Sequence, residues 1–159
     1  MLRDINIRKN MDIRIDKVTK PPGWIKSGAT YTLVYKDNTL YCIRTGKYIG
    51  FDKVVPSFAN RGIEGVLSSK LAGLMIDKMN TGRLQEIEEF EPKINDQNLD
   101  MMAREKDCYL IARSEIEGVD FSDTFYTMKL KTKQGKFKFQ FSNVTDREQA
   151  KILVTKLST

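Results

Sequence analysis

The last third of the sequence constrains the fold most, because it alternates apolar and charged residues on both sides of a glycine turn and then changes to helical periodicity. Thr127 to Lys133 and Lys136 to Phe141 have the period of two that is typical of strands. A two-residue turn at Gln134-Gly135 places Lys131 opposite Lys138. This register gathers the apolar residues of both strands on one face. They are Met128, Leu130, Phe137, Phe139 and Phe141.

A helix is predicted over 145–157. Thr145 and Glu148 have the spacing of a capping box, and Asp146 suits the positive end of the helix dipole. The apolar stripe of this helix consists of Ala150, Leu153, Val154 and Leu157. Strands followed by a closing helix indicate an α+β domain with an antiparallel sheet.

Two further strand regions precede this part of the chain. Met11 to Asp16 alternates with Met11, Ile13 and Ile15 on one face, and Pro21-Pro22-Gly23 ends that strand. Residues 30–44 predict a hairpin that turns at Lys36-Asp37-Asn38. Both of its faces are apolar, so we expect one face to meet the core and the other to meet another element. The first face carries Leu33, Tyr35, Leu40 and Cys42, and the second carries Val34, Tyr41 and Ile43.

The middle of the chain is helical in pattern. Residues 63–80 have an apolar arc and a separate arc of small residues, and they are too short and too charged to span a bilayer. Small side chains allow another backbone to approach closely, either within the chain or from a second copy. Residues 84–106 are acidic, broken by Pro92, and predict a solvated connector. The candidate self-association residues are Gly65, Ser69, Ala72 and Gly73.

The run from Asp107 to Val119, the strands of 128–141 and the helix from Asp146 together resemble the bacterial pleckstrin-homology-like (PH-like) and GRAM-like domains. The resemblance covers about 30–158. It implies a strongly bent seven-strand antiparallel sheet or partial barrel with a C-terminal capping helix and a helical insert. It also implies binding without enzymatic activity or a cofactor. We therefore expect an N-terminal arm at 1–22 and a single PH-like domain at 23–159, with the insert at about 60–106.

Composition also limits the kinds of catalytic and metal-binding site that the chain can form. The chain has no histidine, which removes the commonest general base and the commonest zinc ligand, and no phosphate-binding glycine loop occurs. We therefore expect no enzyme activity, no metal and no cofactor. Cys42 and Cys108 lie in apolar strand-like runs and are expected to be small buried hydrophobes. No secretory signal pattern is present, so a reducing cytoplasm is the expected compartment.

A formal charge of +6 permits an anionic partner. The candidate anion or lipid surface is the lysine face of the last hairpin. Its lysines repel one another across the two strands. An anionic partner would relieve this repulsion; alternatively, the face is simply solvated and its charges are screened by salt. Nucleic acid is disfavoured, because the phenylalanines face away from the lysines. We expect a binding or scaffold module that acts through protein contacts and self-associates; the alternative is a peripheral binder of anionic lipid. The lysine face comprises Lys129, Lys131, Lys133, Lys136 and Lys138.

Overall fold

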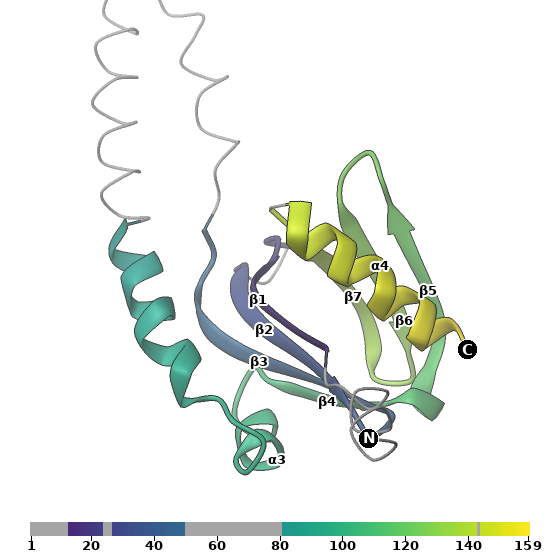
Figure 1. Cartoon of the computed structure of the whole chain (residues 1–159), viewed down its shortest axis with the longest axis horizontal. Coiled ribbons are helices and arrows are strands. Elements are labelled where there is room, and N and C mark those ends of the chain that lie inside the picture. Colours follow the sequence, from purple (N-terminus) through teal and green to yellow (C-terminus); the bar gives the residue numbers. More distant parts are fainter. Residues whose placement is uncertain (1–12, 24–26, 50–80, 143) are drawn as a thin grey trace, which may run out of the picture.

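Figure 1 shows the computed structural model, which describes residues 13–23, 27–49, 81–142 and 144–159. The fold is α+β, with a seven-stranded antiparallel sheet in the order β4-β3-β2-β1-β7-β6-β5. The predicted fold class is confirmed at this level. The strands are β1 Ile13–Lys20, β2 Ala29–Lys36, β3 Thr39–Lys47, β4 Tyr109–Ala112, β5 Ile116–Ser122, β6 Thr127–Thr132 and β7 Gly135–Gln140. The helices are residues 81–90, η1 Glu91–Lys93, α3 Leu99–Ala103, η2 Arg113–Glu115 and α4 Val144–Ser158.

The sheet has two parts that meet at a narrow junction. Strands β1–β4 pair extensively with one another, as do β5–β7, whereas β1 and β7 pair only at Thr19 and Gln140. The inner face of the sheet holds the main core, which α4 covers with Ala150, Leu153 and Leu157. The predicted helix stripe is therefore confirmed, with Val154 partly buried against the same core. Helix α4 begins at Val144, so the expected cap residue Thr145 lies inside its first turn.

The hairpin of β2 and β3 turns at Asp37 and Asn38, whose φ angles of 49° and 56° are left-handed. Asp and Asn tolerate this region better than most residues, as the sequence suggested. Both faces of the hairpin are covered, which confirms the prediction. Leu33, Leu40 and Cys42 enter the main core. On the other face a second cluster contains Val34, Ile43, Ile94 and Leu99.

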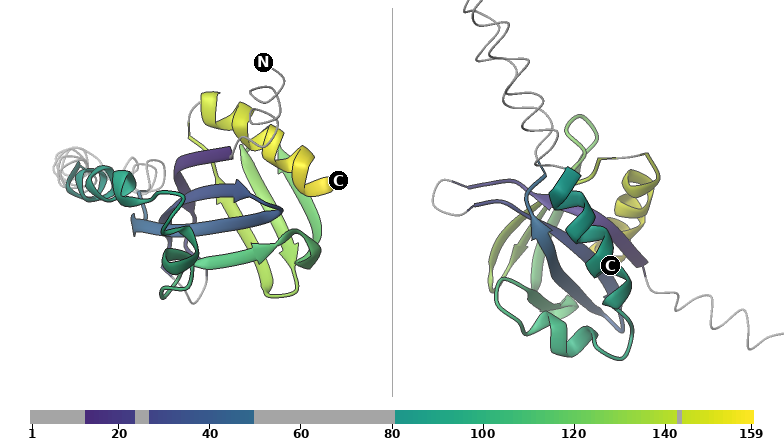
Figure 2. Two further views of the ribbon diagram at one scale, coloured as in Figure 1. Left: turned by 60° about the horizontal axis from the view of Figure 1, so that its bottom comes forward. Right: turned by 90° about the vertical axis from the view of Figure 1, so that its left-hand side faces the viewer.

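The acidic stretch provides the cover for that second face. Figures 1 and 2 show the helix of residues 81–90 on a different side of the sheet from α4. Most acids of this stretch are exposed, as a solvated connector requires, but Glu91 is buried. The connector interpretation is therefore wrong for Glu91, because the outer face of β2 and β3 is apolar and needs a packing partner. The small-residue arc at Gly65, Ser69, Ala72 and Gly73 lies outside the described residues.

The end of the expected N-terminal arm belongs to the sheet. Residues 13–20 form β1, which lies between β2 and β7. Ile13, Ile15 and Val18 are buried, so the alternation read from the sequence reflects packing in the core. The pairing with β2 is irregular between Ile15 and Val18, where Lys17 has a φ of 55°. Met11 lies outside the described residues.

The register of β6 and β7 differs by two residues from the predicted one. The turn is Lys133-Gln134, and Thr132 pairs with Gly135. The hydroxyl of Thr132 donates to the carbonyl of Gly135 (2.9 Å) and accepts from the main-chain N–H of Gln134 (3.1 Å), and these two hydrogen bonds close the observed turn. A shift by two leaves each side chain on its face. All five apolar residues of the predicted face are therefore buried: Met128, Leu130, Phe137, Phe139 and Phe141.

Candidate anion-binding surfaces

The lysine face lies on the outer side of β6 and β7, and all five lysines are exposed. In the observed register Lys131 is opposite Lys136 and Lys129 is opposite Lys138, while Lys133 is in the turn. The predicted partners Lys131–Lys138 and Lys133–Lys136 are therefore wrong. The repulsion between facing lysines is nevertheless present. Lysines recur at alternate positions of both strands, so a two-residue shift in register places another lysine opposite each one.

Two carboxylates of β5 reduce the charge of this face. Lys131 lies 3.9 Å from Glu117, and Asp120 is opposite Lys129. In the described part of the chain none of the other four lysines has an ion pair. Directly facing like charges destabilise a sheet by about 0.2–1 kcal/mol per pair. The face thus keeps an excess of positive charge.

A second positive site is a pocket of about 330 Å³ at the end of the strands where β1, β2 and β3 meet the loop before β4. Sequence reasoning missed it, because its residues are separated by up to 89 positions and follow no motif. It is named here the mouth pocket. The lining residues are Lys20, Ser27, Ala29, Tyr31, Arg44, Lys106, Asp107 and Tyr109.

Asp107 organises this pocket. Its carboxylate accepts a hydrogen bond from Arg44 Nη1 at 2.9 Å, and its main-chain carbonyl accepts one from the Tyr31 hydroxyl at 2.8 Å. Its φ of 62° is left-handed. On the other side, Lys20 Nζ lies 5.2 Å from the ring centre of Tyr109 and 5.6 Å from that of Phe137. These distances are typical of cation–π contacts.

The phenol and thiol groups at and near the pocket are held in their protonated forms. Burial, with a smaller effect of Tyr109, raises the pKa of Tyr31 far above its usual value, so its hydroxyl stays protonated. Burial also raises the pKa of the Cys42 and Cys108 thiols, and both cysteines are free. A thiol with a raised pKa is a poor nucleophile at neutral pH, because the thiolate is the reactive form.

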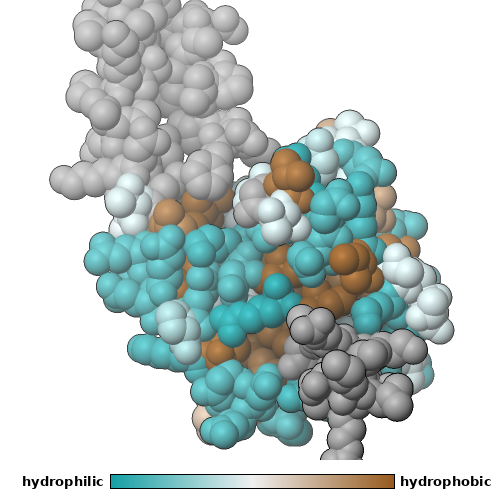
Figure 3. Space-filling model, viewed as in Figure 1, coloured by the Kyte–Doolittle hydropathy of each residue, from teal (hydrophilic) through white to brown (hydrophobic). Residues whose placement is uncertain are grey.

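The exposed apolar side chains form no comparable site on the face seen in Figure 3, where apolar surface lies in separate patches among hydrophilic residues. Among the described residues, the large exposed ones are Met101 in α3, Phe125 in the turn between β5 and β6, and Val144 and Ile152 in α4. Within the described ranges, no three His, Cys, Asp or Glu residues group as metal ligands would. None of the helices in those ranges has the length and hydrophobicity needed to cross a bilayer.

Comparison of the chain with protein-family models, with curated proteins and with solved structures gave no match.

Proposed function

We propose that this chain is a non-enzymatic binding domain of PH-like fold that docks on anionic membrane surfaces through the lysine face. The PH-like assignment is supported by the strand order, by the narrow β1–β7 junction at which the sheet changes direction, and by the closing helix α4. The observation that carries the functional proposal is the β6–β7 register, which holds lysines directly opposite one another.

The spacing of a sheet makes these charges act together. Neighbouring strands are about 4.8 Å apart, and alternate residues of a strand about 7 Å apart. Adjacent lysines of the face therefore lie within the Debye length of about 8 Å at physiological salt. An anionic surface would feel their combined potential and would relieve the repulsion within the pairs Lys129–Lys138 and Lys131–Lys136.

The shape and chemistry of the face favour a lipid surface over nucleic acid. Phe137 and Phe139 point into the core, so no aromatic ring of β7 is available to stack on bases. All five cations are lysines, which act as point charges, whereas arginine forms the bidentate contacts used to read specific groups. Lysines near a bilayer surface each add about 1 kcal/mol of attraction.

Vesicle sedimentation tests this proposal. The wild-type chain is expected to bind phosphatidylglycerol vesicles and not phosphatidylcholine vesicles, with binding that weakens as salt rises. The double variant Lys129→Gln/Lys138→Gln should bind about 10- to 30-fold more weakly, from two lysines at about 1 kcal/mol each. Lys47→Gln/Lys93→Gln removes the same charge from exposed lysines elsewhere and is the control. Equal binding to both lipids, or an equal loss in the control, would refute the proposal.

Self-association through protein contacts is the second candidate, and it rests on the sequence spacing of Gly65, Ser69, Ala72 and Gly73. Light scattering of the wild-type chain and of Gly73→Leu at micromolar concentration tests it. An assembly that the variant disrupts without lowering the melting temperature would support this candidate. A monomeric wild-type chain would exclude it.

A further inference from the structure

We propose that the free edge of β5 is a docking site for a strand formed by residues 3–8 of the same chain. These residues precede β1 and lie outside the described ranges. Strand β5 stands at one end of the sheet order, and Figure 1 shows it at the margin of the sheet, beside α4. This inference concerns neither the lysine face nor the mouth pocket, and it is independent of membrane docking.

The two ends of the sheet differ in how their main-chain groups are satisfied. At the β4 end, the carbonyl of Leu110 accepts a hydrogen bond from the Gln134 side chain (2.9 Å). The main-chain N–H of Ala112 donates to Glu115 Oε2 (3.2 Å). Side chains of the protein itself therefore occupy the edge of β4, and no described side chain does the same for β5.

The hydrogen bonds of β6 show which main-chain groups of β5 are free. In an antiparallel ladder, pairs that exchange hydrogen bonds alternate with pairs that do not. The N–H of Phe141 donates to the carbonyl of Tyr126 (3.0 Å), so the even-numbered residues of β6 bond to β7. The odd-numbered residues of β6 consequently bond to their partners on β5. Those partners are Gly118, Asp120 and Ser122.

The main-chain groups of Val119 and Phe121 therefore point away from β6. None of the described residues forms a hydrogen bond with them. Both side chains are only partly buried against the main core. Unpaired N–H and C=O groups along an edge are a template for another strand. Such a strand would also cover the apolar side chains that β5 leaves half exposed.

Residues 3–8 have the pattern that this edge requires. Their sequence, Arg-Asp-Ile-Asn-Ile-Arg, alternates with the period of a strand and has one apolar face. In an antiparallel pairing that places Ile7 opposite Val119, Ile5 lies opposite Phe121. This register would continue the apolar inner face of the sheet by one strand.

The charges of the two segments are complementary in the same register. Strand β5 carries exposed carboxylates at Glu117 and Asp120, and the exposed Asp123 follows it. Arg8 would lie diagonally across from Asp120, which has no ion pair in the described part of the chain. Arg3 would lie opposite Asp123. Opposite charges on neighbouring strands stabilise their pairing.

The chain is long enough to make this connection. Ile13, at the start of β1, pairs with Tyr35 beside the β2–β3 turn. The carbonyl of Asn38 in that turn accepts a hydrogen bond from the N–H of Arg113 (2.8 Å), three residues before β5 begins. Strands β1 and β5 thus both begin near this turn. Residues 8–12 connect the proposed strand to β1 and allow a separation of about 20 Å when extended.

Amide hydrogen exchange of the full chain, followed by NMR, tests the pairing. The N–H groups of Val119 and Phe121 should be protected in the wild-type chain. The variant Ile5→Asp/Ile7→Asp makes the apolar face of the segment charged and should speed their exchange about tenfold or more. The N–H of Leu130, which bonds to β7, is the internal reference and should not change.

A matched control separates pairing from an effect of added charge. Leu2→Asp/Asn10→Asp introduces the same two carboxylates just outside the segment and should leave the exchange of Val119 and Phe121 unchanged. Unprotected amides at both positions in the wild-type chain would overturn the proposal. Equal effects of the two double variants would also overturn it.

A disulfide tests whether the strand comes from the same molecule. Directly opposite residues that exchange hydrogen bonds have Cα atoms about 5.5 Å apart, within reach of a disulfide. Ile7→Cys/Val119→Cys, in a Cys108→Ser background, should therefore form an intramolecular disulfide on oxidation. Ile7→Cys/Ile152→Cys places the second thiol on an exposed position of α4 and should not. A covalent dimer in place of the intramolecular link would show that a second copy supplies the strand, which contradicts the proposal.

Discussion

The side-chain amide of Gln134 donates a hydrogen bond of 2.9 Å to the main-chain carbonyl oxygen of Leu110. Gln134 lies in the β6–β7 turn, and Leu110 lies in β4, the strand at one end of the sheet order. The same amide donates to Glu115 Oε2 at 2.9 Å, and the main-chain N–H of Lys133 donates to the carbonyl of Glu115 at 3.0 Å. These contacts join parts of the sheet that do not pair as strands.

The two hydrogen bonds of the Gln134 side chain, called here the Gln134 latch, should contribute measurably to the free energy of unfolding. Gln134→Ala removes both side-chain hydrogen bonds, and each is worth about 0.5–1.5 kcal/mol, with exposed bonds at the lower end. We expect the free energy of unfolding to fall by about 1 kcal/mol in urea titrations. Gln97→Ala changes an exposed glutamine whose side chain has no hydrogen bond among the described residues, so it should have little effect. Equal stabilities of the two variants would show that the latch contributes nothing.

Helix α4 should be a major source of stability through its inner face. Leu153 is fully buried, whereas its neighbour Ile152 is 46% exposed. Leu153→Ala should lower the free energy of unfolding by about 2–5 kcal/mol through lost burial and a cavity. Ile152→Ala, which also shortens an aliphatic side chain, should change it by about 0.5 kcal/mol or less. Thermal and urea unfolding measure both, and similar losses would contradict the packing of α4.

The observed register of β6 and β7 predicts a charge coupling. Lys136→Glu places a carboxylate opposite Lys131 and should stabilise the protein by a few tenths to about 1 kcal/mol at low salt. A double-mutant cycle with Lys131→Gln isolates this interaction. In the register predicted from sequence, residue 136 faces Lys133, so coupling to Lys133 in place of Lys131 would contradict the structure.

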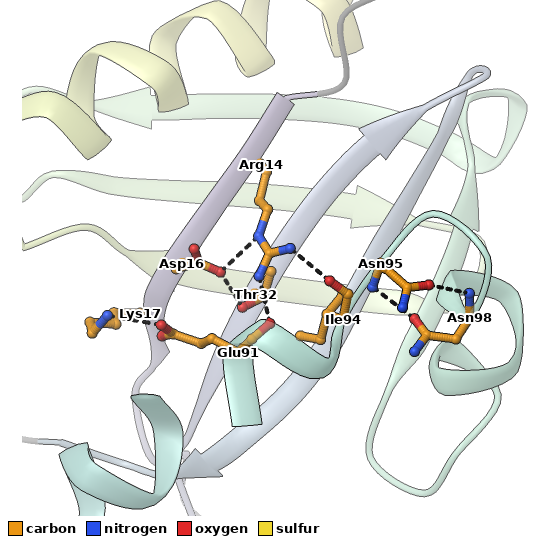
Figure 4. Close-up of polar contacts among 8 residues, drawn as sticks. All are labelled: Arg14, Asp16, Lys17, Thr32, Glu91, Ile94, Asn95 and Asn98. Carbon is orange, nitrogen blue, oxygen red and sulfur yellow. Dashed lines mark hydrogen bonds and ion pairs between the residues drawn. The ribbon is translucent and has the colours of Figure 1, made fainter. Parts of the chain in front are cut away.

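The ion pair that holds the acidic stretch on β1 predicts a dependence of stability on pH. Figure 4 shows Lys17 Nζ donating to Glu91 Oε2 at 2.9 Å, beside Arg14, which donates to the carbonyls of Glu91 (2.8 Å) and Ile94 (2.9 Å). Burial raises the pKa of Glu91 above 4.5 despite the hydrogen bond from Lys17, and Asp16 and Glu88 raise it further. The second oxygen, Oε1, is buried, and none of the residues that the structure describes donates a hydrogen bond to it.

The sign of the effect follows from the raised pKa. The folded chain binds the proton of Glu91 more tightly than the unfolded chain does, so protonation of Glu91 stabilises the fold. This stabilisation is complete below pH 4.5, the ordinary pKa of a glutamate, and is lost as the pH rises through the raised pKa of the folded state. Glu91→Gln should flatten this part of the stability curve. Urea unfolding between pH 4 and pH 7 measures it, with the exposed Glu86→Gln as the control. Parallel curves for wild type and Glu91→Gln would contradict the assignment.

The alternation of apolar residues predicted most strands and their buried faces. Local sequence is sufficient to predict the strands and their faces, because successive side chains alternate across a strand. The Asp37-Asn38 turn and the apolar stripe of α4 also depend only on residues that are neighbours in the sequence. The β6–β7 register was less determined, because registers that differ by two bury the same phenylalanines. The hydrogen bonds of the Thr132 hydroxyl and of the Gln134 side chain accompany the observed turn.

The sequence by itself thus determined the α+β class, the two apolar faces of the β2–β3 hairpin and the presence of a lysine face, since each follows from short-range periodicity. Tertiary structure decided that β1 belongs inside the sheet, that Glu91 is buried against Lys17, and that Lys20, Arg44 and Lys106 share a pocket with Asp107. Lys17 and Glu91 are 74 positions apart, Arg44 and Asp107 are 63 apart, and Thr19 of β1 and its partner Gln140 of β7 are 121 apart. They depend on how the sheet bends and on which segment covers each face, and no local pattern encodes either.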